Sequence, residues 1–142
     1  ILAILELVLK DKKKRIERCN QLLEDFNLTK VRKQKGFMLS GGERRRVEIA
    51  RALAQNPRYI LLDEPFTGVD PIAVADLQDI VRGLKKMGLG VLITDHSVRE
   101  TLAITDRAYI MYSGKILVSG DAKDIAEDEK ARKFYLGDRF NM

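Results

Sequence analysis

Two short apolar runs, separated by one helical segment, constrain the fold of this chain more than any other feature. Tyr59–Leu62 and Val91–Thr94 are almost entirely apolar, as strands buried on both faces of a parallel sheet are. Asp70 followed by Pro71 is typical of a capped helix start, which places a helix between the two strands. The pattern predicts a βαβ unit with a right-handed crossover.

The segment before this unit is expected to be helical. Its apolar residues recur at helical spacing, which predicts one amphipathic helix or a pair up to about residue 25. The residues at this spacing are Ile16, Cys19, Leu23 and Phe26. Another helix follows Ser40 and ends before Pro57, because the residue preceding a proline disfavours helical geometry.

A hairpin and further helices are expected after the βαβ unit. Ser113 and Gly114 separate two apolar runs, as the turn of a hairpin does. The expected elements are a helix near residues 97–104, strands over 108–112 and 116–118, and a helical part that Asp121 and Asp124 open and Leu136 ends. The fold class is therefore α/β, with a helical lobe over residues 1–56 and an α/β lobe over residues 57–142.

The composition excludes several classes of protein. Of the 142 residues, 45% are hydrophobic and 33% are charged, which is typical of a globular chain and not of a disordered one. The single cysteine, Cys19, is expected to be buried and excludes a disulfide framework or a cysteine-based metal site. The apolar run at residues 1–10 is too short to span a bilayer and lacks the cleavage pattern of a signal peptide. The net charge of +5 arises from a basic excess in residues 1–58. The lysines and arginines of residues 10–18 are typical of a solvated helix face, and no aromatic residues interleave with them, so no nucleic-acid partner is expected.

The stretch from Leu39 to Glu43, which continues as RRRVEIARAL, allows two interpretations. Ser40 and Glu43 have the spacing of a capping box, in which each side chain accepts from the backbone N–H of the other residue. A capping box does not explain Gly41 and Gly42, since each glycine weakens a helix relative to alanine. Glycines here leave the amides of the helix N-terminus open to an anion such as a phosphate. The stretch alone does not decide between the two interpretations.

Polar residues follow both predicted strands, at the sheet edge where parallel α/β proteins bind their ligands. Asp63 could hold Mg²⁺, directly or through water, and Glu64 could accept a proton from an attacking water. His96, after the second strand, could hydrogen-bond a terminal phosphate. Taken singly, the two acids are typical of a turn, His96 of a structural residue and Asp70 of a helix cap. Their co-occurrence favours a phosphate-hydrolysing site.

Three motifs together resemble the ATP-binding subunits of ABC transporters: LSGGERRRVEIARAL, then YILLDEPFTGVDP, then VLITDH. By this resemblance, Leu39–Glu43 is the signature motif that contacts nucleotide, Tyr59–Asp63 the Walker B strand and Glu64 the catalytic glutamate. Gly68–Asp70 matches the D-loop and His96 the switch histidine. The resemblance covers essentially the whole chain.

The resemblance implies a partial P-loop NTPase fold, in which a helical subdomain precedes a parallel-sheet core, a hairpin and C-terminal helices. It also implies ATP and Mg²⁺ as ligands, a second ATPase subunit in a head-to-tail dimer, and transmembrane permease subunits as partners. Such a protein is cytoplasmic and peripheral on the inner membrane. The stretches RRRVEIARAL and GLGVLITDHSVRETL resemble in particular the ATPases of lipopolysaccharide export, and branched-chain amino-acid importers are the alternative.

One departure from the family pattern is large. The chain contains no G-x-x-x-x-G-K-[ST] loop, whose lysine and backbone amides hold the β- and γ-phosphates. Gly36–Gly41 and Gly83–Gly88 have the glycine spacing, but neither is followed by lysine. The chain starts at Ile1 within a helical run, so we expect it to be the rear portion of such a subunit.

The missing phosphate loop gives a first testable prediction. We expect the purified 142-residue chain neither to bind nor to hydrolyse ATP on its own, because it lacks the phosphate loop that would hold the β- and γ-phosphates. The measurement is magnesium-dependent phosphate release, and a clear turnover would contradict the prediction.

Three alternatives from other classes remain open at this level. An ATPase of DNA repair or chromosome condensation shares the signature and Walker B motifs, but its coiled coil would need sustained heptads, which this chain lacks. A non-enzymatic basic module would be retained on heparin or duplex DNA, with a steep salt dependence. The chain could also fold partly differently from its parent protein, since an incomplete sheet has open edges.

Overall fold

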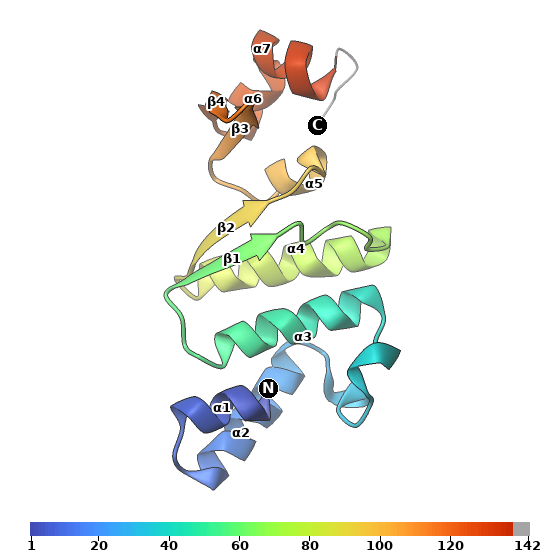
Figure 1. The fold of residues 1–142 in the computed structure, drawn as a ribbon, viewed down its shortest axis with the longest axis vertical. Coiled ribbons are helices and arrows are strands. Elements are labelled where there is room, and N and C mark those ends of the chain that lie inside the picture. The colour runs from blue at the N-terminus through green and yellow to red at the C-terminus, as the bar shows by residue number, and fades with distance from the viewer. Residues whose placement is uncertain (138–142) are drawn as a thin grey trace. The chain divides into compact units, whose positions relative to one another are not determined.

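The computed structural model describes residues 1–137, which form two compact units, Ile1–Thr94 and one that begins at Asp95 (Figure 1). Each unit is described by itself. The predicted division into a helical lobe over residues 1–56 and an α/β lobe over residues 57–142 differs from this one and stays a prediction.

The first unit contains the predicted helices and the βαβ pattern. Its elements in chain order are α1 (Leu2–Val8), α2 (Lys12–Asp25), η1 (Thr29–Val31), η2 (Gly36–Met38), α3 (Gly41–Leu53), β1 (Tyr59–Asp63), α4 (Pro71–Lys86) and β2 (Gly90–Thr94). The N-terminal segment is therefore a pair of helices. Of the four residues at helical spacing, Ile16 is 41% exposed and the other three are buried, among them Cys19 as predicted.

Short acidic or hydroxyl side chains start the longer helices. Asp11 accepts from the backbone N–H of Lys13, 2.7 Å away, at the start of α2. Asp70 accepts from the N–H of Ala73, at 3.0 Å, at the start of α4. These caps satisfy N–H groups that have no partner within the helix, so local sequence is enough to fix where each helix begins.

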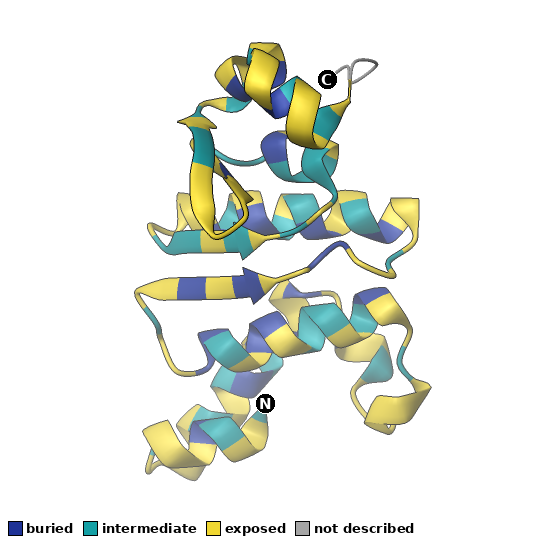
Figure 2. Ribbon diagram, turned by 45° about the horizontal axis from the view of Figure 1, so that its top comes forward, coloured by how far each residue is buried: buried dark blue, intermediate teal, exposed yellow. Residues whose placement is uncertain are grey.

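Strands β1 and β2 pair in parallel, with Tyr59 opposite Gly90 and Asp63 opposite Thr94. Exposed and buried residues alternate along β1 (Figure 2), and the buried ones are Ile60 and Leu62. The expectation that this strand is buried on both faces is wrong for the structure, because Tyr59 and Leu61 are each 73% exposed. Helices cover only one face of the two-stranded sheet.

Helices α3 and α4 pack against each other in the first unit (Figure 1). Arg46 of α3 forms an ion pair with Asp76 of α4, with 3.3 Å between Nη1 and Oδ2. The fully buried large side chains of this unit include Leu22, Ile49 and Leu77, one from each of α2, α3 and α4. The helices therefore share one core, which fixes α3 relative to the loop that precedes α4.

The second unit contains the predicted hairpin and final helices. Its described elements are α5 (Val98–Leu102), β3 (Ala108–Tyr112), β4 (Lys115–Gly120), α6 (Ala122–Glu127), α7 (Glu129–Ala131) and η3 (Arg132–Leu136). Strands β3 and β4 pair antiparallel through a turn at Ser113 and Gly114, which both have positive φ as such tight hairpins require. Ile110 and Ile125 lie in the small core of this unit.

Candidate functional site

The start of α3 forms the predicted capping box. Ser40 Oγ accepts from the backbone N–H of Glu43 at 3.3 Å, and the N–H of Ser40 donates to Glu43 Oε2 at 2.8 Å. The hydrogen bond from the Ser40 backbone, and then that from its side chain, hold the pKa of the Glu43 carboxyl below its ordinary value of 4.5. The capping interpretation of Ser40 is confirmed, and it leaves the anion-binding interpretation open because the two use the same helix start.

The lowered pKa of Glu43 predicts a pH dependence of stability. Since the folded-state pKa lies below the unfolded-state value, ionised Glu43 stabilises the fold at pH values above 4.5, and this contribution is lost as the pH falls below that value. We expect Glu43→Gln to abolish this part of the acid sensitivity, measured as the free energy of unfolding of the full-length protein between pH 6 and 3. An unchanged pH profile in the variant would contradict the prediction.

Gly41 and Gly42 have different surroundings. A Cβ added at Gly42 would lie 2.9 Å from the Cβ of Ala73 in α4, a separation that real side chains do not adopt. A Cβ added at Gly41 would lie 3.5 Å from the carbonyl oxygen of Gly68, an ordinary contact. The close approach of α3 and α4 is therefore a structural reason for Gly42, and the sequence alone did not reveal it.

This contrast gives a stability prediction for two neighbouring glycines. We expect Gly42→Ala to lower the free energy of unfolding by about 1–3 kcal/mol, because the added methyl overpacks the contact with Ala73. Gly41→Ala, the matched control, is expected to leave stability unchanged or raise it by up to about 1 kcal/mol. Chemical denaturation of the full-length variants measures both, and equal effects would show that the helix contact does not require glycine.

Asp63 lies at the end of β1, where its partner in the sheet register is Thr94. The Thr94 hydroxyl donates to Asp63 Oδ1, which orients the carboxylate. Mg²⁺ in phosphate sites is typically bound by one or two carboxylates together with phosphate oxygens and water, so the Asp63 carboxylate is a suitable ligand for the ion. Within residues 1–137 no cluster of three or more acidic, histidine or cysteine side chains could hold a metal by itself. The carboxylate of Asp63 is therefore compatible with Mg²⁺ delivered together with a phosphate ligand.

Glu64 follows directly and has an unusual backbone. Its φ is 44°, in the left-handed region that residues other than glycine rarely adopt, and it precedes Pro65. Such a conformation costs about 1–3 kcal/mol and is common at functional sites. The N–H of Glu64 donates to the carbonyl of Thr94 at 2.7 Å, and its carboxylate accepts from Thr67 Oγ1 at 3.2 Å. The residue is exposed, so its carboxylate is accessible to water.

The loop between β1 and α4 brings two predicted motifs together. Gly68 turns the chain with a φ of 70°, and Asp70 caps α4 as predicted. Because Gly68 lies beside Gly41, and Ala73 beside Gly42, the start of α3 runs along this loop. The structure therefore places the signature stretch next to the predicted D-loop of the same chain.

His96 belongs to the second unit and is described there by itself. Its side chain is 65% exposed, and its Nδ1 lies 4.0 Å from Oδ1 of Asp95, whose side chain is shielded from solvent. Asp95 Oδ1 also accepts from the N–H of Ser97 at 2.8 Å. The contacts between predicted site residues described above all lie in the first unit. The role of His96 stays a prediction.

Comparison with known proteins identifies the family. The family model described as ABC transporter matches residues 4–67. A probable ABC transporter ATP-binding protein of Azorhizobium caulinodans is 55% identical over 140 residues, which cover 99% of this chain and 50% of that protein. Over nearly its whole length the chain matches the ATP-binding subunits of ABC transporters.

Further relatives of this chain are named for lipopolysaccharide export. The lipopolysaccharide export system ATP-binding protein LptB of Acidithiobacillus ferridurans is 54% identical over 142 residues, covering 100% of this chain and 59% of that protein. LptB of Escherichia coli K12 is 55% identical over 128 residues, covering 90% of this chain and 53% of that protein. The chain thus spans about half the length of the curated relatives that it matches.

Solved ABC ATPases contain the same fold as this chain. A solved ATP-binding cassette of an ABC transporter superposes with a TM-score of 0.81 at 34% identity, over 91% of this chain and 52% of that chain. The ADP conformation of the same cassette gives a TM-score of 0.80 at 34% identity, over 92% of this chain and 52% of that chain. The predicted fold class, a partial P-loop NTPase of the ABC type, is confirmed.

Two residues that contact Glu64, Arg45 and Thr67, were not predicted from the sequence. Arg45 donates from Nη2 to the carbonyl of Glu64 at 3.1 Å, and Thr67 donates to its carboxylate. Thr67 could have been found from its spacing, three residues after Glu64 in a loop. Arg45 carries no such signal, since its partner is 19 residues away in sequence.

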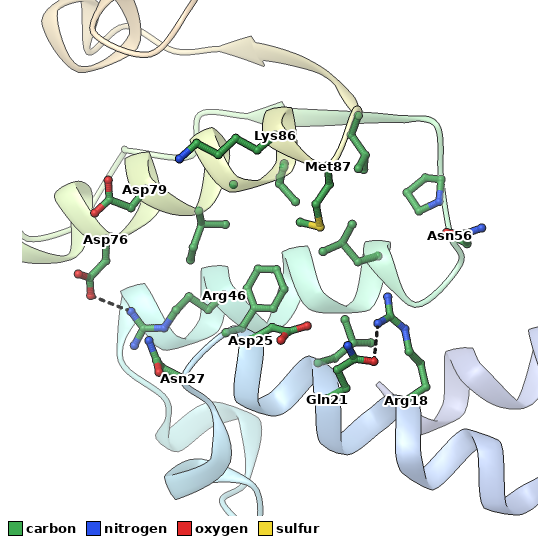
Figure 3. Close-up of a pocket in the computed structure, with 18 residues that line it drawn as sticks. Arg18, Gln21, Asp25, Asn27, Arg46, Asn56, Asp76, Asp79, Lys86 and Met87 are labelled. Atoms are coloured by element: carbon green, nitrogen blue, oxygen red, sulfur yellow. Dashed lines mark hydrogen bonds and ion pairs between the residues drawn. The ribbon is translucent and has the colours of Figure 1, made fainter.

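A cleft lies between helices α2, α3 and α4 of the first unit (Figure 3). It is lined by apolar side chains such as Phe26 and Met87 and by the ion pair between Arg46 and Asp76. None of the predicted site residues lines it, so this cleft is separate from the residues around Glu64.

None of the helices in residues 1–137 has the length and apolar character needed to cross a bilayer.

Proposed function

We propose that the full-length protein containing this chain is the ATP-hydrolysing subunit of an ABC transporter that powers lipopolysaccharide export from the inner membrane. The relatives named LptB support the substrate, and the ABC family supports the activity. The observation that carries the activity is the pair Asp63 and Glu64 at the end of β1, with both carboxylates oriented by threonine hydroxyls. That arrangement supplies a Mg²⁺ ligand and a water-activating group at adjacent positions.

The mechanism assigns separate tasks to the two acids. Asp63 would hold Mg²⁺, directly or through water, and the ion would neutralise charge on the phosphates. The Glu64 carboxylate is exposed to water and is held in place by the Thr67 hydroxyl. In this position it orients the attacking water and accepts its proton. His96 would hydrogen-bond the terminal phosphate.

The start of α3 would serve a second nucleotide. We propose that Ser40, Gly41, Gly42 and Glu43 contact the γ-phosphate held by another ATPase subunit in a head-to-tail dimer, with Asp70 at the same interface. The Ser40 hydroxyl accepts from the N–H of Glu43 as a cap, and its own hydrogen would turn from the Glu43 carboxylate to a phosphate oxygen. An N-terminal helix end with two glycines is a favourable surface for an anion.

The remaining parts of the proposal concern the membrane. Transmembrane permease subunits would couple closure of the dimer to transport, with the ATPase peripheral on the cytoplasmic face of the inner membrane. The test is reconstitution of the full-length protein with its permease subunits in proteoliposomes, followed by ATP-dependent release of lipopolysaccharide to an acceptor. ATP-dependent leucine uptake instead would assign the protein to amino-acid import, and no ATP hydrolysis at all would overturn the activity.

A further inference from the structure

We propose that Arg45 and Thr67 are positioning residues for Glu64, Arg45 through its backbone and Thr67 through its carboxylate. The proposal rests on the role of Glu64 proposed above. It assigns to α3 a second task besides its capped N-terminus, namely to hold the residue that activates water.

Arg45 connects α3 to the loop after β1. Its Nη2 donates to the carbonyl oxygen of Glu64 at 3.1 Å, while its Nη1 forms an ion pair with Glu48 Oε2 at 2.8 Å. The arginine side chain is only 26% exposed. A guanidinium donates in a rigid fork, so the contact with Glu48 fixes the direction of the second donor toward Glu64.

Thr67 holds Glu64 at two points. Its hydroxyl donates to Oε2 at 3.2 Å, and its backbone N–H donates to the carbonyl oxygen of Glu64 at 3.3 Å. The carbonyl therefore accepts from both Arg45 and Thr67, and the carboxylate is tied to the same short loop. Backbone and side chain of Glu64 are fixed together.

Glu64 needs such contacts because of its own geometry. Its backbone has a φ of 44° before a proline, a conformation that persists only where neighbouring groups enforce it. Its side chain is exposed and has three rotatable bonds, so without a partner the carboxylate would sample many directions. Activation of water requires one direction, since misplacement by about 1 Å costs about a hundredfold in rate.

The first test compares valine and serine at Thr67 in the full-length ATPase. Thr67→Val keeps the shape but removes the donor, and we expect kcat to fall about tenfold to a hundredfold with an unchanged Kd for ATP. Thr67→Ser restores the donor and is expected to recover most of kcat. Equal kcat in the valine variant and the wild type would overturn the assignment of Thr67, as would a serine variant that is no better than valine.

The second test concerns Arg45, with Arg44 as the matched control on the same helix. Arg45→Ala is expected to lower kcat about tenfold at an unchanged Kd for ATP, and Arg45→Lys to recover part of it, because lysine offers a donor without the fork. Arg44→Ala is expected to leave kcat unchanged, since this exposed residue does not contact Glu64. If Arg45→Ala and Arg44→Ala have equal effects, or if lysine recovers nothing, Arg45 does not position Glu64.

A double variant separates this proposal from the function on which it rests. In a Glu64→Gln background, Thr67→Val and Arg45→Ala are expected to reduce the residual rate no further, because they act through Glu64. Full turnover in Glu64→Gln itself would refute the role of Glu64. Loss of turnover in Glu64→Gln with undiminished kcat in the Thr67 and Arg45 variants would refute only the positioning.

Discussion

Replacement of Glu64 by glutamine in the full-length protein is expected to slow ATP hydrolysis by about 10²–10⁴-fold, the usual contribution of a general base. Glutamine has the shape of glutamate and can still accept from the Thr67 hydroxyl, but it cannot take a proton from water at neutral pH. The neighbouring Asp63 is unchanged, so binding of ATP with Mg²⁺ is expected to be retained. Phosphate release and equilibrium binding of labelled ATP measure the two effects separately.

A matched control for this variant lies on α2. Glu24→Gln makes the same chemical change at an exposed position away from the loop after β1, and we expect it to leave hydrolysis unchanged. Retained turnover in Glu64→Gln would refute the role given to Glu64. Loss of ATP binding together with hydrolysis would indicate that Glu64 supports the nucleotide site rather than the water.

The features predicted correctly from the sequence are those that neighbouring residues determine. The capping box of Ser40 and Glu43 and the cap of Asp70 on α4 need only residues within three positions of each other. The parallel pair of β1 and β2 followed from two apolar runs separated by a helix, because that connection favours parallel strands. Local chemistry was enough to predict where these elements begin and end. The predicted site residues lie at these ends.

The features that were missed depend on contacts between distant segments. Gly42 is explained by Ala73, and Arg45 by the carbonyl of Glu64, and neither pair has a spacing that a sequence pattern would reveal. Strand β1 was expected to be covered on both faces, yet Tyr59 is exposed, because apolar composition does not tell which element lies on which face. The surroundings of these residues therefore follow from packing between distant segments and not from the local sequence.

These contacts also bring together two motifs that are separated in sequence. Gly41 lies beside Gly68, Gly42 beside Ala73, and Arg45 reaches Glu64, so the first turns of α3 follow the loop after β1. A displacement of α3 along its axis would break the contact of Arg45 with the backbone of Glu64. Helix α3 is therefore in direct contact with Glu64, the residue proposed to activate water.

Ser40→Ala is expected to separate the two tasks of the signature serine. Loss of a serine cap costs about 1 kcal/mol in the free energy of unfolding. If the Ser40 hydroxyl also donates to a phosphate oxygen, hydrolysis by the full-length dimer is expected to fall about 10²–10³-fold, as when one donor to a transition-state oxygen is removed. Denaturation and steady-state hydrolysis of the same preparation measure both.

The chain contains its own control for this comparison. Asp121 caps α6 in a second capping box, accepting from the N–H of Asp124 at 2.9 Å, so Asp121→Ala removes an equivalent cap outside the first unit. We expect the two variants to lose similar stability, but only Ser40→Ala to lose hydrolysis beyond what its stability explains. If both variants lost hydrolysis only in proportion to stability, Ser40 would be a helix cap and nothing more, and packing against Ala73 would be the reason for glycine at position 42.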